Sequence, residues 1–171
     1  MTQPRTTSNP EVAIVAPPGL PSLTLTREFD APPERVFAAH VDPALFTQWV
    51  GPDDVATEVR SWDARTGGHW SYVGRRDGEE FGFYGSFHEV RPAERIVQTF
   101  TYEGFGDAVS LEVLTLVPLD GGRTRLEALS VFTSVEARDG MVASGMETGV
   151  VEGYRALDAL LDGAAAPGGA A

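Results

Sequence analysis

The chain has 171 residues, 42% of them apolar, with no cysteine, a net charge of −12 and 13 basic residues that are all arginine. This composition suits one domain with its own hydrophobic core, and it excludes disulfides, zinc–thiolate sites and mechanisms that need a lysine amine. The negative charge argues against nucleic acid as a partner, and no segment approaches the roughly 20 apolar residues of a membrane span, so we expect a cytoplasmic protein that binds neither nucleic acid nor membrane.

The two ends of the chain differ in composition from its middle. Residues 1–19 are rich in Pro, Thr and Ser, and residues 163–171 contain only Gly, Ala and Pro. Neither stretch shows a hydrophobic period, which is typical of disordered tails. We therefore expect one folded domain over residues 20–162.

The first elements of this domain are predicted from alternation and capping signals. Ser22–Phe29 alternates apolar and polar residues, as a half-buried strand does. Residues 30–40 read as a helix that Asp30 would cap, with prolines in its first turn. A second short helix is predicted to begin at residues 42–43 and to end at residues 51–52.

A run of strands follows, separated by turn signals. The dipeptide Asp77-Gly78 predicts a tight hairpin, because both central positions of such a turn favour positive φ. No crossover of 10–15 residues separates the strands, so about seven of them are expected to form an antiparallel meander. The strands after the first are predicted at residues 55–62, 69–75, 81–90, 96–102, 110–118 and 123–132.

The chain is predicted to end in one long helix over residues 134–162, with an apolar stripe that needs the sheet as its support. The stripe contains Met146, Val150, Leu157, Leu160 and Leu161. Glycines recur in this helix at positions 145, 149 and 153, each at a cost of about 1 kcal/mol relative to alanine. Two interpretations stay open: the glycines allow close packing, or they leave space for a ligand.

Aromatic residues gather on one face of several predicted strands, with Gly85 between two of them. Such a surface suits a pocket for a small, largely apolar molecule, and the buried tyrosine hydroxyls would need polar partners. A core filled with rings is the alternative interpretation. The candidate ligand-binding residues are Trp49, Trp70, Tyr72, Phe83, Phe87, Phe100, Tyr102, Met146, Val150 and Tyr154.

Signatures of catalysis and of metal binding are absent from the sequence. It has no nucleophile elbow and no dinucleotide-binding glycine motif. His40, His69 and His88 are not spaced with one another or with carboxylates as zinc ligands are. We therefore assign no catalytic residue, no metal and no cofactor.

Six segments follow one another in an order that is similar to that of a known family: residues 25–37, 45–52, 63–70, 85–97, 122–126 and 144–157. Over residues 22–162 the chain resembles the branch of the START/Bet v-like (SRPBCC) superfamily that is named for the activator of heat-shock protein 90 ATPase (AHSA-type). The resemblance implies an α+β helix-grip fold: a curved antiparallel sheet around a long C-terminal helix, two short helices after the first strand, and a cavity between sheet and helix.

The resemblance implies no particular reaction, because the superfamily spans carriers, receptors, cyclases and chaperone partners. The leading hypothesis is binding of a small hydrophobic or amphipathic molecule in the cavity. A protein-interaction or co-chaperone module and a cofactor-free cyclase-like enzyme are the alternatives, so enzymatic activity stays open. A homodimer also stays open, because edge strands need cover.

Overall fold

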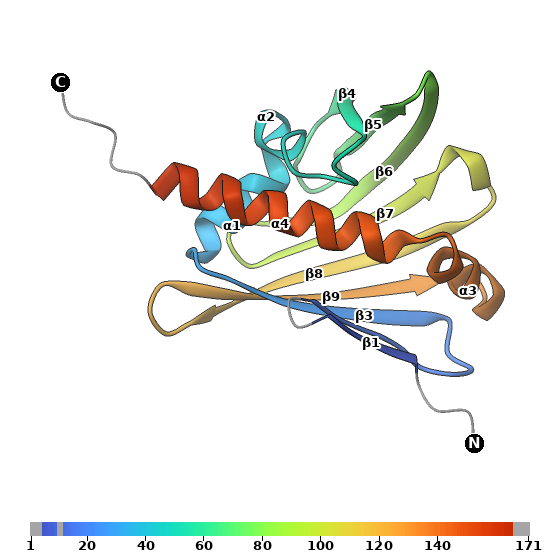
Figure 1. The fold of residues 1–171 in the computed structure, drawn as a ribbon, viewed down its shortest axis with the longest axis horizontal. Coiled ribbons are helices and arrows are strands. Elements are labelled where there is room, and N and C mark those ends of the chain that lie inside the picture. The colour runs from blue at the N-terminus through green and yellow to red at the C-terminus, as the bar shows by residue number, and fades with distance from the viewer. Residues whose placement is uncertain (1–4, 10–11, 166–171) are drawn as a thin grey trace.

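The computed structural model describes residues 5–9 and 12–165 (Figure 1). Within these residues nine strands form one sheet in the order β1-β2-β3-β9-β8-β7-β6-β5-β4, and the ladders between neighbours are antiparallel. The strands are β1 (Arg5–Asn9), β2 (Val12–Ala16), β3 (Ser22–Phe29), β4 (Ala56–Trp62), β5 (His69–Arg76), β6 (Glu79–Arg91), β7 (Arg95–Tyr102), β8 (Val109–Leu119) and β9 (Arg123–Phe132). The helices are α1 (Pro33–Val41), α2 (Pro43–Phe46), the 3-10 turn η1 (Glu103–Phe105), α3 (Val135–Ala143) and α4 (Met146–Ala165).

Helix α4 lies across one face of the curved sheet, with α1 and α2 at one end and α3 at the other (Figure 1). This is the predicted helix-grip architecture, which is confirmed. The predicted meander is present as β4 to β9, and β3 pairs with β9 on one side and with β2 on the other. No helix among the described residues has the length and apolarity needed to cross a bilayer.

The hairpin predicted at residues 77–78 has the expected backbone. Asp77 and Gly78 have φ values of 52° and 82°, and they join β5 to β6. Positive φ at both positions matches the right-handed twist of the flanking strands. The turn therefore fixes the register in which Tyr72 pairs with Phe83.

The predicted disordered N-terminal tail is wrong for residues 5–9 and 12–16, which form β1 and β2. Ile14 pairs with Leu25 of β3, and Val12 and Ile14 are 2% and 7% exposed. The run from Val12 to Ala16 is short, but its alternate side chains enter the core, so it extends the sheet. Residues 1–4 and 10–11 lie outside the described residues.

The single long C-terminal helix is also corrected, because the chain forms α3 and α4 instead. Ser134 caps α3 by accepting a hydrogen bond from the Ala137 backbone N–H at 3.0 Å. Gly145 has φ of 85°, a left-handed conformation that breaks the helix. At the other end α4 continues past the predicted stop to Ala165, and residues 166–171 lie outside the described residues.

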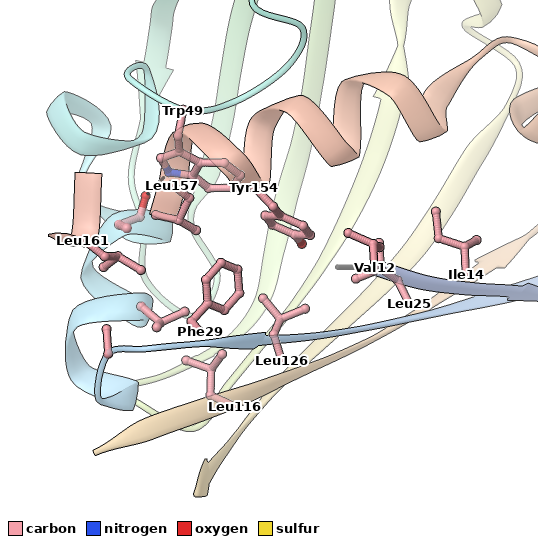
Figure 2. Packing of buried hydrophobic residues seen from close by; sticks show 13 residues of the cluster. Val12, Ile14, Leu25, Phe29, Trp49, Leu116, Leu126, Tyr154, Leu157 and Leu161 are labelled. Carbon is pink, nitrogen blue, oxygen red and sulfur yellow. Dashed lines mark hydrogen bonds between the residues drawn. The ribbon is translucent and has the colours of Figure 1, made fainter. Parts of the chain in front are cut away.

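The helix α4 is held to the sheet by an apolar cluster beneath it. Figure 2 shows Tyr154 and Leu157 directed from α4 toward Phe29 and Leu126 of the sheet. Leu126 and Leu157 are fully buried, and the Phe29 and Tyr154 rings meet edge-on at a centroid distance of 5.4 Å. Burial of such side chains contributes about 1.5–3 kcal/mol each, so this cluster fixes where the helix lies.

Candidate functional site

A cavity of about 320 Å³ lies between α4 and the inner face of the sheet. Strands β3 to β9 and helices α1 to α4 all contribute to its wall, together with the segment after α2. The wall residues are Leu23, Leu25, His40, Phe46, Trp49, Val50, Trp62, Trp70, Tyr72, Phe87, Ile96, Gln98, Phe100, Glu112, Val113, Leu114, Ala128, Ser130, Phe132, Met141, Met146, Val150 and Tyr154. A mostly apolar wall with a few polar groups is the usual composition of a small-molecule site.

Eight of the ten residues predicted from the sequence lie at this wall. These are Trp49, Trp70, Tyr72, Phe87, Phe100, Met146, Val150 and Tyr154. The sheet contributes the rings of Trp70, Tyr72, Phe87 and Phe100. Strand alternation therefore placed the rings on the correct face.

Phe83 and Tyr102 are not part of the wall and lie beside it, as cross-strand neighbours in a row that begins at Tyr72. The Phe83 ring stacks on Tyr72 at 5.0 Å, and the Tyr102 ring lies 5.2 Å from Phe83. On its other side the Tyr102 ring contacts the ring of Phe105, which is 65% exposed. The expectation that Tyr102 faces the cavity is therefore not met, because alternation gives the face of a strand but not the distance along it.

Two of the glycines that suggested empty space, Gly85 and Gly153, are sites of close packing. A Cβ on Gly85 would lie 2.0 Å from the Thr99 carbonyl oxygen and 2.6 Å from the Trp70 ring, so the indole of Trp70 occupies that space. A Cβ on Gly153 would lie 3.0 Å from the Trp49 carbonyl oxygen. The packing interpretation fits Gly153, although its neighbour is the segment after α2 and not the sheet.

The three tryptophans at the wall differ in their hydrogen bonds. The Nε1–H groups of Trp49 and Trp62 donate to the carbonyl oxygens of Ala39 and Val41 at 2.9 and 2.7 Å. Trp70 Nε1 is buried and has no partner among the described residues. A buried donor without a partner is uncommon, so the indole of Trp70 keeps one unused donor close to the wall.

Glu112 is the functional candidate that the sequence analysis missed. Its carboxylate accepts hydrogen bonds from Ser110 Oγ at 2.5 Å and from Ser130 Oγ. Burial raises the pKa of the Glu112 carboxyl, and the two serine hydrogen bonds oppose that rise. The ladders place Gln98, Glu112 and Ser130 in one row, so a polar strip crosses the otherwise apolar cavity wall.

A signal for Glu112 was present in the sequence. Along β8 the inward positions are Ser110, Glu112, Leu114 and Leu116, whereas Leu111 points outward and is 42% exposed. The usual arrangement of polar outside and apolar inside is therefore reversed over the first half of this strand. A buried carboxyl at an inward position is a functional candidate on physical grounds.

His40 contributes a second polar group that the sequence analysis left without a role. Its Nδ1 lies 2.7 Å from the Val36 carbonyl oxygen, and its Nε2 is buried without a partner among the described residues. Burial lowers the pKa of His40 to about 4, so the ring is neutral at pH 7. Nδ1 then carries the proton that it donates to Val36, and Nε2 keeps a free lone pair at the wall.

The hydroxyls of Tyr72 and Tyr154 complete the polar groups of the cavity. Burial raises the pKa of both phenols, and the nearby Arg27 guanidinium opposes the rise at Tyr154. Neither hydroxyl hydrogen-bonds to another described residue. Both stay protonated at neutral pH, so each can donate as well as accept a hydrogen bond.

A second hollow, of about 480 Å³, is polar and lies where the C-terminal part of α4 meets β3. Its arginines are already paired: Arg27 with Asp158, and Arg123 with Glu28 and Asp30. The described residues contain no group of three His, Asp or Glu that could hold a metal ion. We therefore take the apolar cavity as the candidate site.

The comparisons with known proteins agree with this architecture. The family described as "Activator of Hsp90 ATPase homolog 1-like protein" matches residues 30–162. The chain belongs to this family. The family membership predicted from the sequence is thus confirmed, together with its place in the SRPBCC superfamily. No curated protein matched the chain.

Several solved structures of other proteins are similar to this chain in fold. A protein from Rhodobacter sphaeroides is 30% identical, with 90% of this chain and 99% of that chain covered and a TM-score of 0.81. A protein from Mycobacterium smegmatis is 28% identical, with coverages of 94% and 99% and a TM-score of 0.78. The AHSA1 protein from Silicibacter pomeroyi is 25% identical, with coverages of 82% and 97% and a TM-score of 0.66.

Proposed function

We propose that this family member binds a small hydrophobic or amphipathic molecule between α4 and the sheet. The observation that carries the proposal is the cavity of about 320 Å³ with its aromatic wall. Pockets for small ligands usually measure about 300–1,000 Å³, so this cavity suits a molecule of two or three rings. A solidly filled core would have left no such space.

The wall supports this proposal in its chemistry as well as in its size. Rings from the sheet (Trp70, Phe100), from α4 (Tyr154) and from the segment after α2 (Trp49) would enclose the apolar body of the ligand. Unpaired polar atoms on Trp70 and His40 would orient its polar group. Phe83 would act indirectly, because its ring stacks on that of Tyr72, and Tyr102 in turn contacts Phe83.

The experiment uses the uncharged fluorophore N-phenyl-1-naphthylamine as a probe. All three tryptophans of the protein line the cavity, so energy transfer from them to the bound probe reports occupancy. Ala128→Phe fills the cavity from β9 and should abolish the signal. Leu129→Phe introduces the same ring at the next residue of β9, which points to the outer face of the sheet, and it should leave the energy-transfer signal unchanged.

Circular dichroism and thermal melting must show that both variants are folded. Binding that survives in folded Ala128→Phe, or that is lost equally in Leu129→Phe, would contradict a site inside the cavity. Native mass spectrometry of protein purified from its own host provides an independent check, since a retained small molecule would appear as an added mass.

The second candidate is a protein-interaction module, which the family description suggests. One observation favours it: the outer face of β8 and β9 exposes Val109, Leu111, Leu129 and Val131, each between 36% and 42% exposed. Adjacent exposed apolar residues on a sheet are typical of interaction surfaces. Stimulation of the ATPase rate of a 90-kDa heat-shock chaperone, lost in Leu111→Arg, would support it over ligand binding alone.

A further inference from the structure

Glu112 is the one acidic side chain among the described residues that line the cavity, and those residues include no arginine or lysine. Burial lowers the pKa of His40 to about 4, so that ring is neutral at pH 7 and supplies no positive charge. The described residues that hydrogen-bond the carboxyl group of Glu112 are Ser110 and Ser130. A buried carboxylate without a cation is costly, so it favours any ligand that supplies positive charge.

His40 is a second hydrogen-bond acceptor at the wall, and it also favours a ligand that brings a donor. His40 Nε2 presents a lone pair with no donor opposite it among the described residues. Glu112 and His40 thus place two acceptors at the wall, whereas the hydroxyls of Tyr72 and Tyr154 can donate as well as accept a hydrogen bond. A ligand that brings N–H donors satisfies Glu112 and His40 better than one that brings only acceptors.

The aromatic rings add to this preference. Trp70 and Tyr72 stack at 5.6 Å, and Phe100 lies 5.8 Å from Trp70. The faces of aromatic rings attract cations through their quadrupole, most strongly when water is excluded. Rings and a carboxylate at one wall are the features by which proteins recognise organic ammonium ions.

We propose that the ligand is an organic cation: an apolar or aromatic body bearing a protonated amine that pairs with Glu112. This inference rests on the proposed function and specifies its ligand class. A fatty acid or another amphipathic anion would place a second negative charge beside Glu112 without a basic side chain to receive it. A purely apolar ligand would leave the carboxylate uncompensated inside a drier cavity.

The test compares three probes that share one ring system and differ in the charge of the polar group. These are 2-naphthylmethylamine, 2-naphthalenemethanol and 2-naphthoate, titrated calorimetrically at pH 7. We expect the ammonium probe to bind at least about tenfold more tightly than the alcohol, because a charge-assisted hydrogen bond is roughly twice as strong as a neutral one. The carboxylate probe should bind most weakly of the three.

Variants locate the preference at Glu112. Glu112→Gln keeps the shape of the side chain but removes its charge, so it should reduce the ammonium preference to within about twofold of the alcohol. Glu79→Gln removes an equal charge from the exposed hairpin after β5 and should leave the preference intact. This control accounts for the general attraction of a cation to a protein of net charge −12.

The outcomes separate the two proposals. If no probe binds, both the cavity function and the cation are contradicted. If the alcohol binds as tightly as the ammonium, the cavity function stands and the cation is overturned. A preference that persists in Glu112→Gln also overturns the assignment. If that variant does not fold, the wild type decides: a buried pair keeps its preference from 0.05 to 0.5 M NaCl, whereas a surface attraction loses it.

Discussion

Arg27 of β3 and Asp158 of α4 form a two-pronged ion pair, with Nη1–Oδ1 and Nη2–Oδ2 distances of 2.7 and 2.5 Å. The Arg27 side chain is 4% exposed, whereas that of Asp158 is 43% exposed. The guanidinium also lies 4.5 Å from the centroid of the Phe29 ring. The pair therefore joins the helix to the sheet beside the cavity, where a change in helix position would alter the wall.

Breaking this pair from the helix side should destabilise the fold. Asp158→Ala leaves the buried Arg27 charge without its partner, and we expect a loss of about 2 kcal/mol in the free energy of unfolding. Replacing both residues, as in Arg27→Met with Asp158→Leu, should cost less than Asp158→Ala alone. Urea unfolding measures the three free energies, and a double variant that is the least stable would contradict an uncompensated charge as the cause.

Two glycines of α4 should respond to alanine in opposite directions. A Cβ at Gly149 would meet Pro52 at 3.4 Å, an ordinary contact, so Gly149→Ala should stabilise the protein by up to about 1 kcal/mol through helix propensity. At Gly153 the Cβ would lie 3.0 Å from a carbonyl oxygen, and the gain should be lost or reversed. Thermal melting compares the two, and equal shifts would show that the backbone of residues 49–51 yields.

The sequence predicted the strands β3 to β9 well, because their alternation and their turn residues specify the same boundaries. It failed where a short element depends on partners distant in the chain. The run from Val12 to Ala16 has little signal alone, and it becomes a strand because β3 offers it a free edge. The sequence also predicts Gly145 within a helix, because the hydrophobic periodicity carries no information about the φ angle of a single residue.

The N-terminal strand β2 should therefore contribute measurably to stability. Ile14 is 7% exposed and packs in the cluster that contains Leu25, so Ile14→Ala should lower the free energy of unfolding by about 2–3 kcal/mol. Val15 points to the other face, and Val15→Ala should cost less than about 1 kcal/mol. Equal, negligible effects in chemical denaturation would mean that β2 is not part of the cooperative unit.

The candidate site was predictable in its rings but not in its polar groups. Large aromatic residues at alternate positions identified the face that surrounds the cavity. Glu112 and His40 escaped notice because a lone carboxylate in a strand and a lone histidine in a helix are usually solvated. Their surroundings come from distant residues: the His40 ring contacts Trp49, and Glu112 is hydrogen-bonded by Ser130 of β9.

Burial of His40 should make the protein less stable in mild acid. Its pKa is about 4 in the folded state and 6.5 in the reference state, so the unfolded chain binds the proton first as the pH falls. Stability is retained above pH 6.5 and lost progressively toward pH 4, by roughly 3 kcal/mol in total. His40→Phe should remove this component, and a difference curve between variant and wild type that is flat from pH 4 to 7 would contradict it.

Burial of Glu112 should act in the opposite direction. Because its pKa is raised in the folded state, the unfolded chain releases the proton first as the pH rises above the ordinary glutamate range near 4.5. The wild type should therefore lose stability relative to Glu112→Gln as the pH increases from 4 toward 8. The contribution of His40 is common to both proteins and cancels in their difference, which denaturant unfolding at several pH values measures.

An added organic ammonium ion should narrow this difference in stability between wild type and Glu112→Gln, because the ion stabilises the ionised carboxylate and the cavity without ligand does not. A difference that is constant with pH would mean that Glu112 is solvated in the folded protein, and it would remove the electrostatic reason for a cationic ligand.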